Sequence, residues 1–199
     1  MNETDRLEAF SDAVMAVIIT IMAFNVKPPG AASLSAVRAS LPELLVYVLS
    51  FAIIGTYWNN HHHLLRATHR MSAGVMWSNL HLLFWLSLFP VATGWVGLFP
   101  GDPVPAAFYG VVGLASAFAY WILVRAIIRA NGADSQVARR IGSDLKGKLS
   151  PVLYAAGIGL AFATSIGADV VYAAVAAMWL IPDRRLAPGG AMADVHETQ

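Results

Sequence analysis

Arg6-Leu-Glu-Ala-Phe10-Ser11-Asp12 leads directly into an apolar run from Ala13 to Val26. A run of this length predicts a helix that crosses the hydrocarbon core of a membrane, which is about 30 Å thick. A carboxylate that enters such a segment costs a few kcal/mol or more, so Asp12 is expected to face water or a partner. Arg6 lies about 9 Å from Asp12 along a helix, so the two are badly placed to pair on one face.

The composition supports a membrane protein. Hydrophobic residues make up 57% of the chain, charged residues only 13%, and the mean hydropathy is +0.60. A soluble domain usually has about a quarter of its residues charged. The chain contains no cysteine, which excludes disulfides and cysteine metal sites.

The expected architecture is all-α, with six transmembrane helices. Apolar stretches and the prolines and glycines around them place the spans at about 7–26, 42–63, 75–99 and 105–128, with two short helices within 150–181. Gly167-Ala168-Asp169 is the expected turn between the last two. Residues 1–182 are thus predicted to form one membrane domain, and 183–199 a disordered cytoplasmic tail.

The basic residues predict the orientation. All of them except Lys27 and Arg38 fall at the termini or in the loops after the second and fourth spans. Because cytoplasmic loops carry the excess of Lys and Arg, both termini are expected in the cytoplasm, with the protein in the cell inner (plasma) membrane.

One stripe of the first helix combines large apolar side chains with a hydroxyl. Val17, Thr20 or Ile21, and Phe24 recur at helical spacing. The simpler interpretation is a stripe that faces lipid or packs against another helix. The alternative is a pore wall, in which apolar side chains narrow the path and Thr20 offers oxygen to a cation. Such a path needs several copies of the helix around a symmetry axis.

The second span ends in three adjacent histidines, His61, His62 and His63. Neighbours on a helix point about 100° apart, so these three are badly placed to share one ion. No metal site is therefore predicted. A membrane metalloenzyme that also uses His69 and His81 remains an open alternative.

Several polar residues are expected at one depth, near the cytoplasmic boundary. They are Arg6, Ser11, Asp12, Trp58, Asn59, His61, His62, Asn79 and His81. A polar cluster that ties the first three spans together would explain the aspartate at the head of the first helix. Crowding of polar groups near water is the simpler alternative, and topology alone does not separate the two.

Three motifs resemble one known family. Arg6-x-x-x-Phe10-Ser11-Asp12 resembles the R-x-x-x-F-S-D signature of the lysosomal potassium channel family, transmembrane protein 175, and its bacterial relatives. The segment from Tyr57 to His62 is similar to the tryptophan-to-double-histidine segment of that family. A third similar stretch runs from Asn79 to Thr93. The chain is identified as a bacterial member with a single six-helix repeat.

The resemblance implies a potassium-preferring cation channel rather than an enzyme, without a cofactor and with potassium as the permeant ion. It implies a homotetramer in membrane lipid, which conducts potassium and other monovalent cations and has no nucleic-acid partner. By the resemblance, the pore and its apolar constriction involve Val17, Thr20, Ile21 and Phe24; the signature residues Arg6, Phe10, Ser11 and Asp12 are structural; and Trp58, His61, His62 and Asn79 anchor the first helix. Phe24 and Asn25 depart from the family pattern at the outer end of the stripe.

A proton-coupled secondary transporter is the alternative function, with Asp12 and a histidine as a relay. Transporters commonly show internal repeats and broken helices around a site at the membrane midplane. The sequence shows no internal repeat, and Asp12 is predicted near a boundary rather than at the centre. These observations favour the channel.

Overall fold

The computed structural model of the protein describes residues 3–132, 135, 138 and 145–180. This part of the chain folds into α-helices joined by short connections and contains no strand. The all-α prediction is confirmed for these residues. The expected tail at 183–199 lies outside them.

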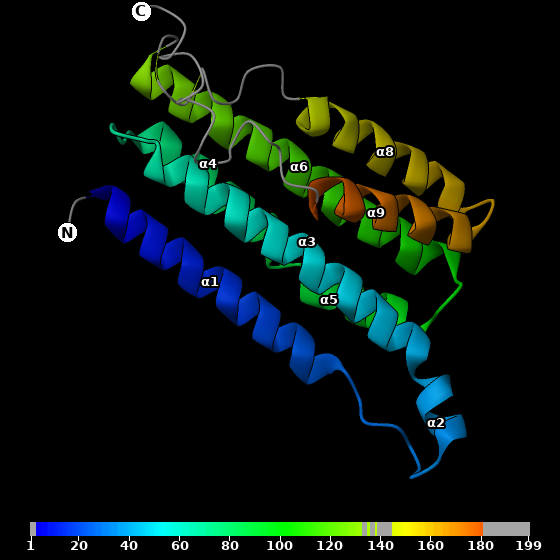
Figure 1. Cartoon of the computed structure of the whole chain (residues 1–199). Coiled ribbons are helices and arrows are strands. Elements are labelled where there is room, and N and C mark those ends of the chain that lie inside the picture. Colours follow the sequence, from blue (N-terminus) through cyan, green and yellow to red (C-terminus); the bar gives the residue numbers. More distant parts are fainter. Residues whose placement is uncertain (1–2, 133–134, 136–137, 139–144, 181–199) are drawn as a thin grey trace, which may run out of the picture.

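The helices follow one another along the chain with the labels of Figure 1. They are α1 Glu3–Asn25, α2 Leu34–Ala39, α3 Leu41–Arg66, α4 Ala73–Leu86, α5 Phe89–Leu98, α6 Pro103–Asn131, α8 Leu145–Ala161 and α9 Ser165–Leu180. The short helix α2 was not predicted from the sequence. Ser33 caps its first turn by accepting a hydrogen bond from the backbone N–H of Ala36.

Within the described residues, four segments are long and apolar enough to cross a membrane: α1, α3, α4 together with α5, and α6. They correspond to the first four predicted spans. Helices α8 and α9 have 17 and 16 residues. At about 1.5 Å per residue they fall short of a 30 Å hydrocarbon core. The count of six spans therefore stays a prediction.

The third predicted span is broken in the middle. Helix α4 ends at Leu86 and α5 begins at Phe89. Pro90 lies in the first turn of α5 and has no N–H to donate to the carbonyl of Leu86, so a continuous helix would lose a hydrogen bond there. The break needs no loop, and the two helices together still cover the length of one span.

The predicted turn at Gly167-Ala168-Asp169 is wrong. These residues lie in the first turns of α9, and the chain reverses at 162–164 instead. Thr164 explains the shift, because its side-chain oxygen accepts a hydrogen bond from the N–H of Gly167 over 3.3 Å. A hydroxyl residue three positions before a helical N–H is the usual N-terminal cap, and here it outweighs the preference of Gly and Asp for turns.

The helices run up and down in a bundle, with α1 at its edge (Figure 1). The start of α1, the end of α3, the start of α4 and the end of α6 lie together at one end of the bundle. Helix α2 and the turn between α8 and α9 lie at the other end. Helix α1 packs against α3, α4 and α5, whereas α8 and α9 pack on α6. One side of α1 is consequently left uncovered by the described part of the chain.

Two glycines of α6 allow the α8–α9 hairpin to pack closely. A Cβ at Gly110 would collide with the ring of Tyr172, and a Cβ at Gly113 with the ring of Tyr154. Both tyrosines are fully buried, and the hydroxyl of Tyr172 donates to the carbonyl oxygen of Ala106 over 3.2 Å. The glycines therefore act here by their lack of a side chain, in the way small residues do between membrane helices.

A buried set of hydroxyls joins α3, α5 and α6. Thr93 Oγ1 donates to Ser50 Oγ over 2.7 Å, and Ser50 Oγ lies 2.9 Å from the hydroxyl of Tyr109. Thr93 Oγ1 also approaches the sulfur of Met22 on α1, at 3.8 Å. Buried hydroxyls are stabilising only when they are hydrogen-bonded, and these three satisfy one another.

Candidate functional site

Three buried polar side chains, linked in series by hydrogen bonds, join α1 to α4 and α3. Asn79 Nδ2 donates to Ser11 Oγ over 2.9 Å, and Asn79 Oδ1 lies 2.6 Å from His61 Nε2. Ser11, Asn79 and His61 are all fully buried. Because the Asn79 amide nitrogen donates to Ser11, its oxygen is the acceptor, and His61 Nε2 carries the hydrogen.

Helical periodicity places Ser11 on the buried side of α1. The buried residues of that helix are Ser11, Met15, Ile18 and Met22, at intervals of three or four. The hydroxyl of Ser11 also donates to the carbonyl oxygen of Leu7 over 2.8 Å. Ser11 is thus both donor and acceptor, and Asn79 links it to His61 of α3.

A second, charged group lies one turn nearer the end of the bundle. His62 Nδ1 of α3 lies 2.8 Å from Glu8 Oε1 of α1, and Arg66 Nε lies 3.7 Å from the same oxygen. Asp12 stands one turn along α1 from Glu8, and ligand atoms of Glu8, Asp12 and His62 all lie within 4.8 Å of one another. Trp58 stacks on the ring of His62, with centroids 5.9 Å apart.

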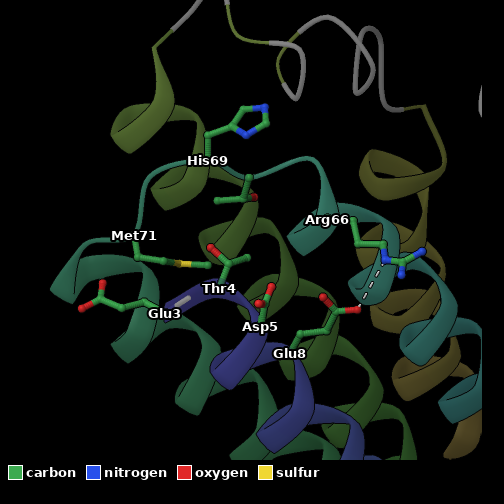
Figure 2. A pocket seen from close by; sticks show the side chains of 8 residues that line it. Glu3, Thr4, Asp5, Glu8, Arg66, His69 and Met71 are labelled. Atoms are coloured by element: carbon green, nitrogen blue, oxygen red, sulfur yellow. Dashed lines mark ion pairs between the residues drawn. The ribbon is translucent and has the colours of Figure 1, made fainter. Parts of the chain in front are cut away.

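A cavity of about 450 Å³ opens beside this charged group (Figure 2). Glu8 and Arg66 face each other across one part of it, where the figure draws their ion pair. The lining residues are Glu3, Thr4, Asp5, Glu8, Arg66, Thr68, His69 and Met71. The cavity joins the first turns of α1 to the end of α3 and the connection that follows it.

The other end of α1 is also held by polar contacts. Asn25 Nδ2 donates to the carbonyl oxygen of Pro90 over 3.3 Å, and the backbone N–H of Lys27 donates to Glu43 Oε1 over 3.1 Å. Asn25 is one of the residues at which the sequence was expected to depart from the family pattern. Its side chain is used within the chain, as a link between α1 and α5.

The face of α1 opposite its buried side is apolar and uncovered. The side chains of Val17, Ile21 and Phe24 are exposed by 54%, 46% and 88%. Thr20 lies on the same side and is also exposed. Its Oγ1 donates to the carbonyl oxygen of Val17 over 2.9 Å, so the lone pairs of the oxygen remain available outward.

The remaining predicted site residues lie apart from the hydrogen-bonded group of Ser11, Asn79 and His61. Arg6 and Phe10 are exposed and line a second cavity, of about 380 Å³, together with Met76 and Leu80 of α4. His81, which was expected at the same depth, accepts a hydrogen bond from Trp85 of its own helix over 3.0 Å. The structural role of Arg6 and Phe10 stays a prediction.

The sequence did not single out Glu8 and Arg66 as site residues. Glu8 and Asp12 are four residues apart, so the local pattern places both on one face of α1. The approach of this face to His62 and Arg66 depends on how α1 packs against α3, which no local pattern contains. The adjacent histidines do diverge as expected: His61 is buried against Asn79, His62 contacts Glu8, and His63 is exposed.

Three comparisons with known proteins point to one family. The family described as endosomal/lysosomal potassium channel TMEM175 matches residues 6–90 of this chain. A protein from Chryseobacterium sp. that is named a potassium channel is 45% identical over 181 residues, which cover 91% of this chain and 94% of that protein. Another, from Streptomyces collinus, is 31% identical over 83% of this chain and 85% of its own length.

The fold is also similar to a solved structure. The crystal structure of a lysosomal potassium-selective channel TMEM175 homolog from Chamaesiphon minutus superposes with a TM-score of 0.79. The two sequences are 26% identical, and the match covers 94% of this chain and 100% of the other. The likeness therefore extends well beyond the motifs in the first hundred residues.

Proposed function

This chain belongs to the endosomal/lysosomal potassium channel TMEM175 family, and from that membership we propose that it conducts potassium passively through a pore lined by α1. The potassium channel relatives match it over most of their length. The chain is accordingly a member of a family of ion channels rather than of enzymes, and the permeant ion is potassium, with no cofactor required.

The observation that carries the proposal is the uncovered stripe of α1. Val17, Ile21 and Phe24 lie on one face, while the opposite face is fixed to the bundle through Met15, Ile18 and Met22. A closed apolar constriction stops ions because water leaves it. A helix anchored on one side and apolar on the other is suited to form the wall of such a constriction.

The pore requires several copies of the chain, and we propose a homotetramer. One α1 does not surround an ion, whereas four related by a symmetry axis do. The position of α1 at the edge of the bundle leaves its stripe accessible to the same helix of other subunits (Figure 1). Membrane lipid then surrounds the outward faces of the other helices.

Thr20 is the proposed hydroxyl layer of this pore. It lies between Val17 and Ile21 on the exposed side of α1, and its oxygen keeps acceptor capacity. In a tetramer, four such oxygens would replace part of the hydration shell of a cation. A layer of neutral oxygens favours a weakly hydrated ion, which supports a preference for potassium with some passage of other monovalent cations.

We further propose that the protein lies in the cell inner (plasma) membrane with both termini in the cytoplasm. The segment 66–72 and the start of α8 carry basic residues, whereas α2 and the loop before it contain Lys27 and Arg38 alone. This asymmetry supports the orientation by the positive-inside rule. The polar chain around Ser11 then lies near the cytoplasmic boundary.

Potassium flux from liposomes tests the proposal. Vesicles that contain the purified protein and a potassium gradient should release potassium faster than empty vesicles, without an added proton gradient. Size-exclusion chromatography with light scattering should show four chains per particle. An absence of flux above that of empty vesicles, with folded tetramers present, would contradict the channel.

The same preparation separates a channel from the proton-coupled transporter. Passive conduction should rise in proportion to the potassium gradient and should be unaffected by a pH difference across the membrane. Uptake that saturates and depends on a proton gradient would instead favour the transporter, with Asp12 and His62, whose ligand atoms lie within 4.8 Å of each other, as the candidate relay.

A further inference from the structure

We propose that Glu8, Asp12 and His62 form a binding site for a divalent cation of the zinc class, which joins α1 to α3. The three residues come from two helices and are neighbours only in the folded chain. The sequence predicts no metal site among the adjacent histidines. The proposed site uses one of those histidines, together with two carboxylates of another helix.

The geometry fits a small ion after modest side-chain rotation. One ligand atom from each residue lies within 4.8 Å of the other two. Zn²⁺ holds nitrogen and oxygen ligands at about 2.0–2.2 Å, which places neighbouring ligands about 3.4 Å apart in a tetrahedral site. His62 Nδ1 and Glu8 Oε1 lie 2.8 Å apart, closer than this, so the two side chains would separate slightly as an ion enters.

One carboxylate oxygen of this group is buried and lacks a hydrogen-bond partner. Among the described residues, Asp12 Oδ1 is a buried atom without a hydrogen-bond partner, whereas His62 Nδ1 faces Glu8 Oε1 over 2.8 Å. A buried carboxylate oxygen left unsatisfied costs free energy, and a cation is the partner that satisfies it best. A metal ion at His62 Nδ1 requires the imidazole hydrogen on the other ring nitrogen, so binding would replace the present contact of Nδ1 with Glu8.

The ligand types indicate the class of ion. One imidazole nitrogen and two carboxylate oxygens suit Zn²⁺ and similar transition-metal ions, whereas Mg²⁺ prefers oxygen ligands and water. Three protein ligands would leave the fourth tetrahedral position for water. The potassium ion that the pore conducts is too large and too weakly bound to compete at such a site.

An approach from the end of the bundle exists. Glu8 also lines the cavity of about 450 Å³ shown in Figure 2, so its carboxylate is reached from that cavity. Arg66 pairs with the same oxygen at 3.7 Å and competes with a bound cation. Its side chain is 68% exposed, so it is free to turn away when a cation binds.

A bound ion would act on α1 directly. It would cross-link Glu8 and Asp12 of α1 to His62 of α3, at the end where Ser11 and Asn79 already join the bundle. This consequence rests on the proposed role of α1 as the pore helix. A metal clamp there should resist any movement of α1 that opens the pore, so micromolar Zn²⁺ on the cytoplasmic side should lower potassium flux.

Binding is tested without any ion flux, so that the site and the channel can fail separately. Zn²⁺ alone is titrated by calorimetry into the metal-free full chain in detergent, with Mg²⁺ and K⁺ in parallel. The expected result is one Zn²⁺ per chain, an increase in melting temperature, and no comparable response to Mg²⁺ or K⁺. Mg²⁺ binding as tight as that of Zn²⁺ would contradict the proposal that His62 is one of the metal ligands.

The variants E8Q, D12N and H62Q should each weaken Zn²⁺ binding about tenfold or more, since loss of even an outer-shell group commonly costs that much. H63Q is the matched control, because His63 is an exposed histidine that is not one of the three proposed ligands. R66Q should tighten binding by removing the competing cation.

If D12N or H62Q fails to fold, E8Q and R66Q decide, because Glu8 and Arg66 lie at the cavity. Unchanged affinity in E8Q, or equal loss in H63Q, would overturn the proposal.

Discussion

Asn79 donates a hydrogen bond to Ser11 over 2.9 Å, and this contact joins α4 to the buried side of α1. The exposed stripe with Val17 and Ile21 runs along the opposite side of the same helix. Anchoring and the proposed conduction are thus separated on two faces of one helix. A substitution on the buried face should therefore mainly lower stability, and a substitution on the exposed face should mainly change potassium flux.

The anchoring contact gives the first prediction. N79A should lower the free energy of unfolding by about 1–2 kcal/mol, because it leaves the buried Nε2 of His61 without a partner and removes the hydrogen bond that Ser11 accepts. Thermal unfolding in detergent measures the change. S78A is the control, since Ser78 is partly exposed and donates its hydrogen bond to Gly74 of its own helix. Equal melting temperatures for both variants would show that the contact contributes little.

The close packing of α8 against α6 gives a second prediction. G113A should destabilise the fold by about 1–3 kcal/mol, because the added methyl group meets the buried ring of Tyr154. G159A is the matched control on α8, where a Cβ meets no atom within 4 Å. Its expected effect is neutral or slightly stabilising. Destabilisation of the same size in G159A would place the cause in the helix backbone rather than in packing.

Much of this fold follows from local patterns. The first four spans are predictable because long apolar runs have few other stable arrangements, and proline or glycine marks their ends. The position of the turn between α8 and α9 was not predicted correctly, because Thr164 caps α9 and Gly167 therefore lies inside that helix. The break before Pro90 was also missed, since a proline between two apolar segments is compatible with a kink as well as with two helices.

The candidate site was predictable in part. The motif residues Ser11, His61 and Asn79 do meet, and their shared depth in the membrane was the available signal. The contact between Glu8 and His62 depends on the rotation of α1 against α3. Charge spacing on one helix fixes the face that Glu8 shares with Asp12, but not the neighbour that this face meets.

The constriction gives a third prediction. I21A should raise passive potassium release from liposomes several-fold, because a smaller side chain widens the apolar path and lets water remain in it. V152A is the control, since Val152 is an exposed apolar residue of α8. A rise in V152A as large as in I21A would indicate general membrane leak. No change in I21A would place the constriction elsewhere.

The hydroxyl layer gives a fourth prediction. T20V should lower the preference for potassium over sodium, because it removes the oxygen that Thr20 presents on the exposed side of α1. The measurement is the reversal potential in planar bilayers with potassium on one side and sodium on the other. S87A removes an exposed hydroxyl of the break between α4 and α5 and should leave the reversal potential unchanged.

The chain has no cysteine, so a single introduced cysteine can report directly on the pore. The measurement is potassium efflux from liposomes that contain V17C or V152C, before and after treatment with a positively charged, water-soluble thiol reagent, with modification followed by mass spectrometry. If the stripe of α1 lines the path, modification of V17C should strongly reduce efflux, while V152C keeps its rate. Unchanged efflux through fully modified V17C would contradict the assignment of α1 as the pore helix.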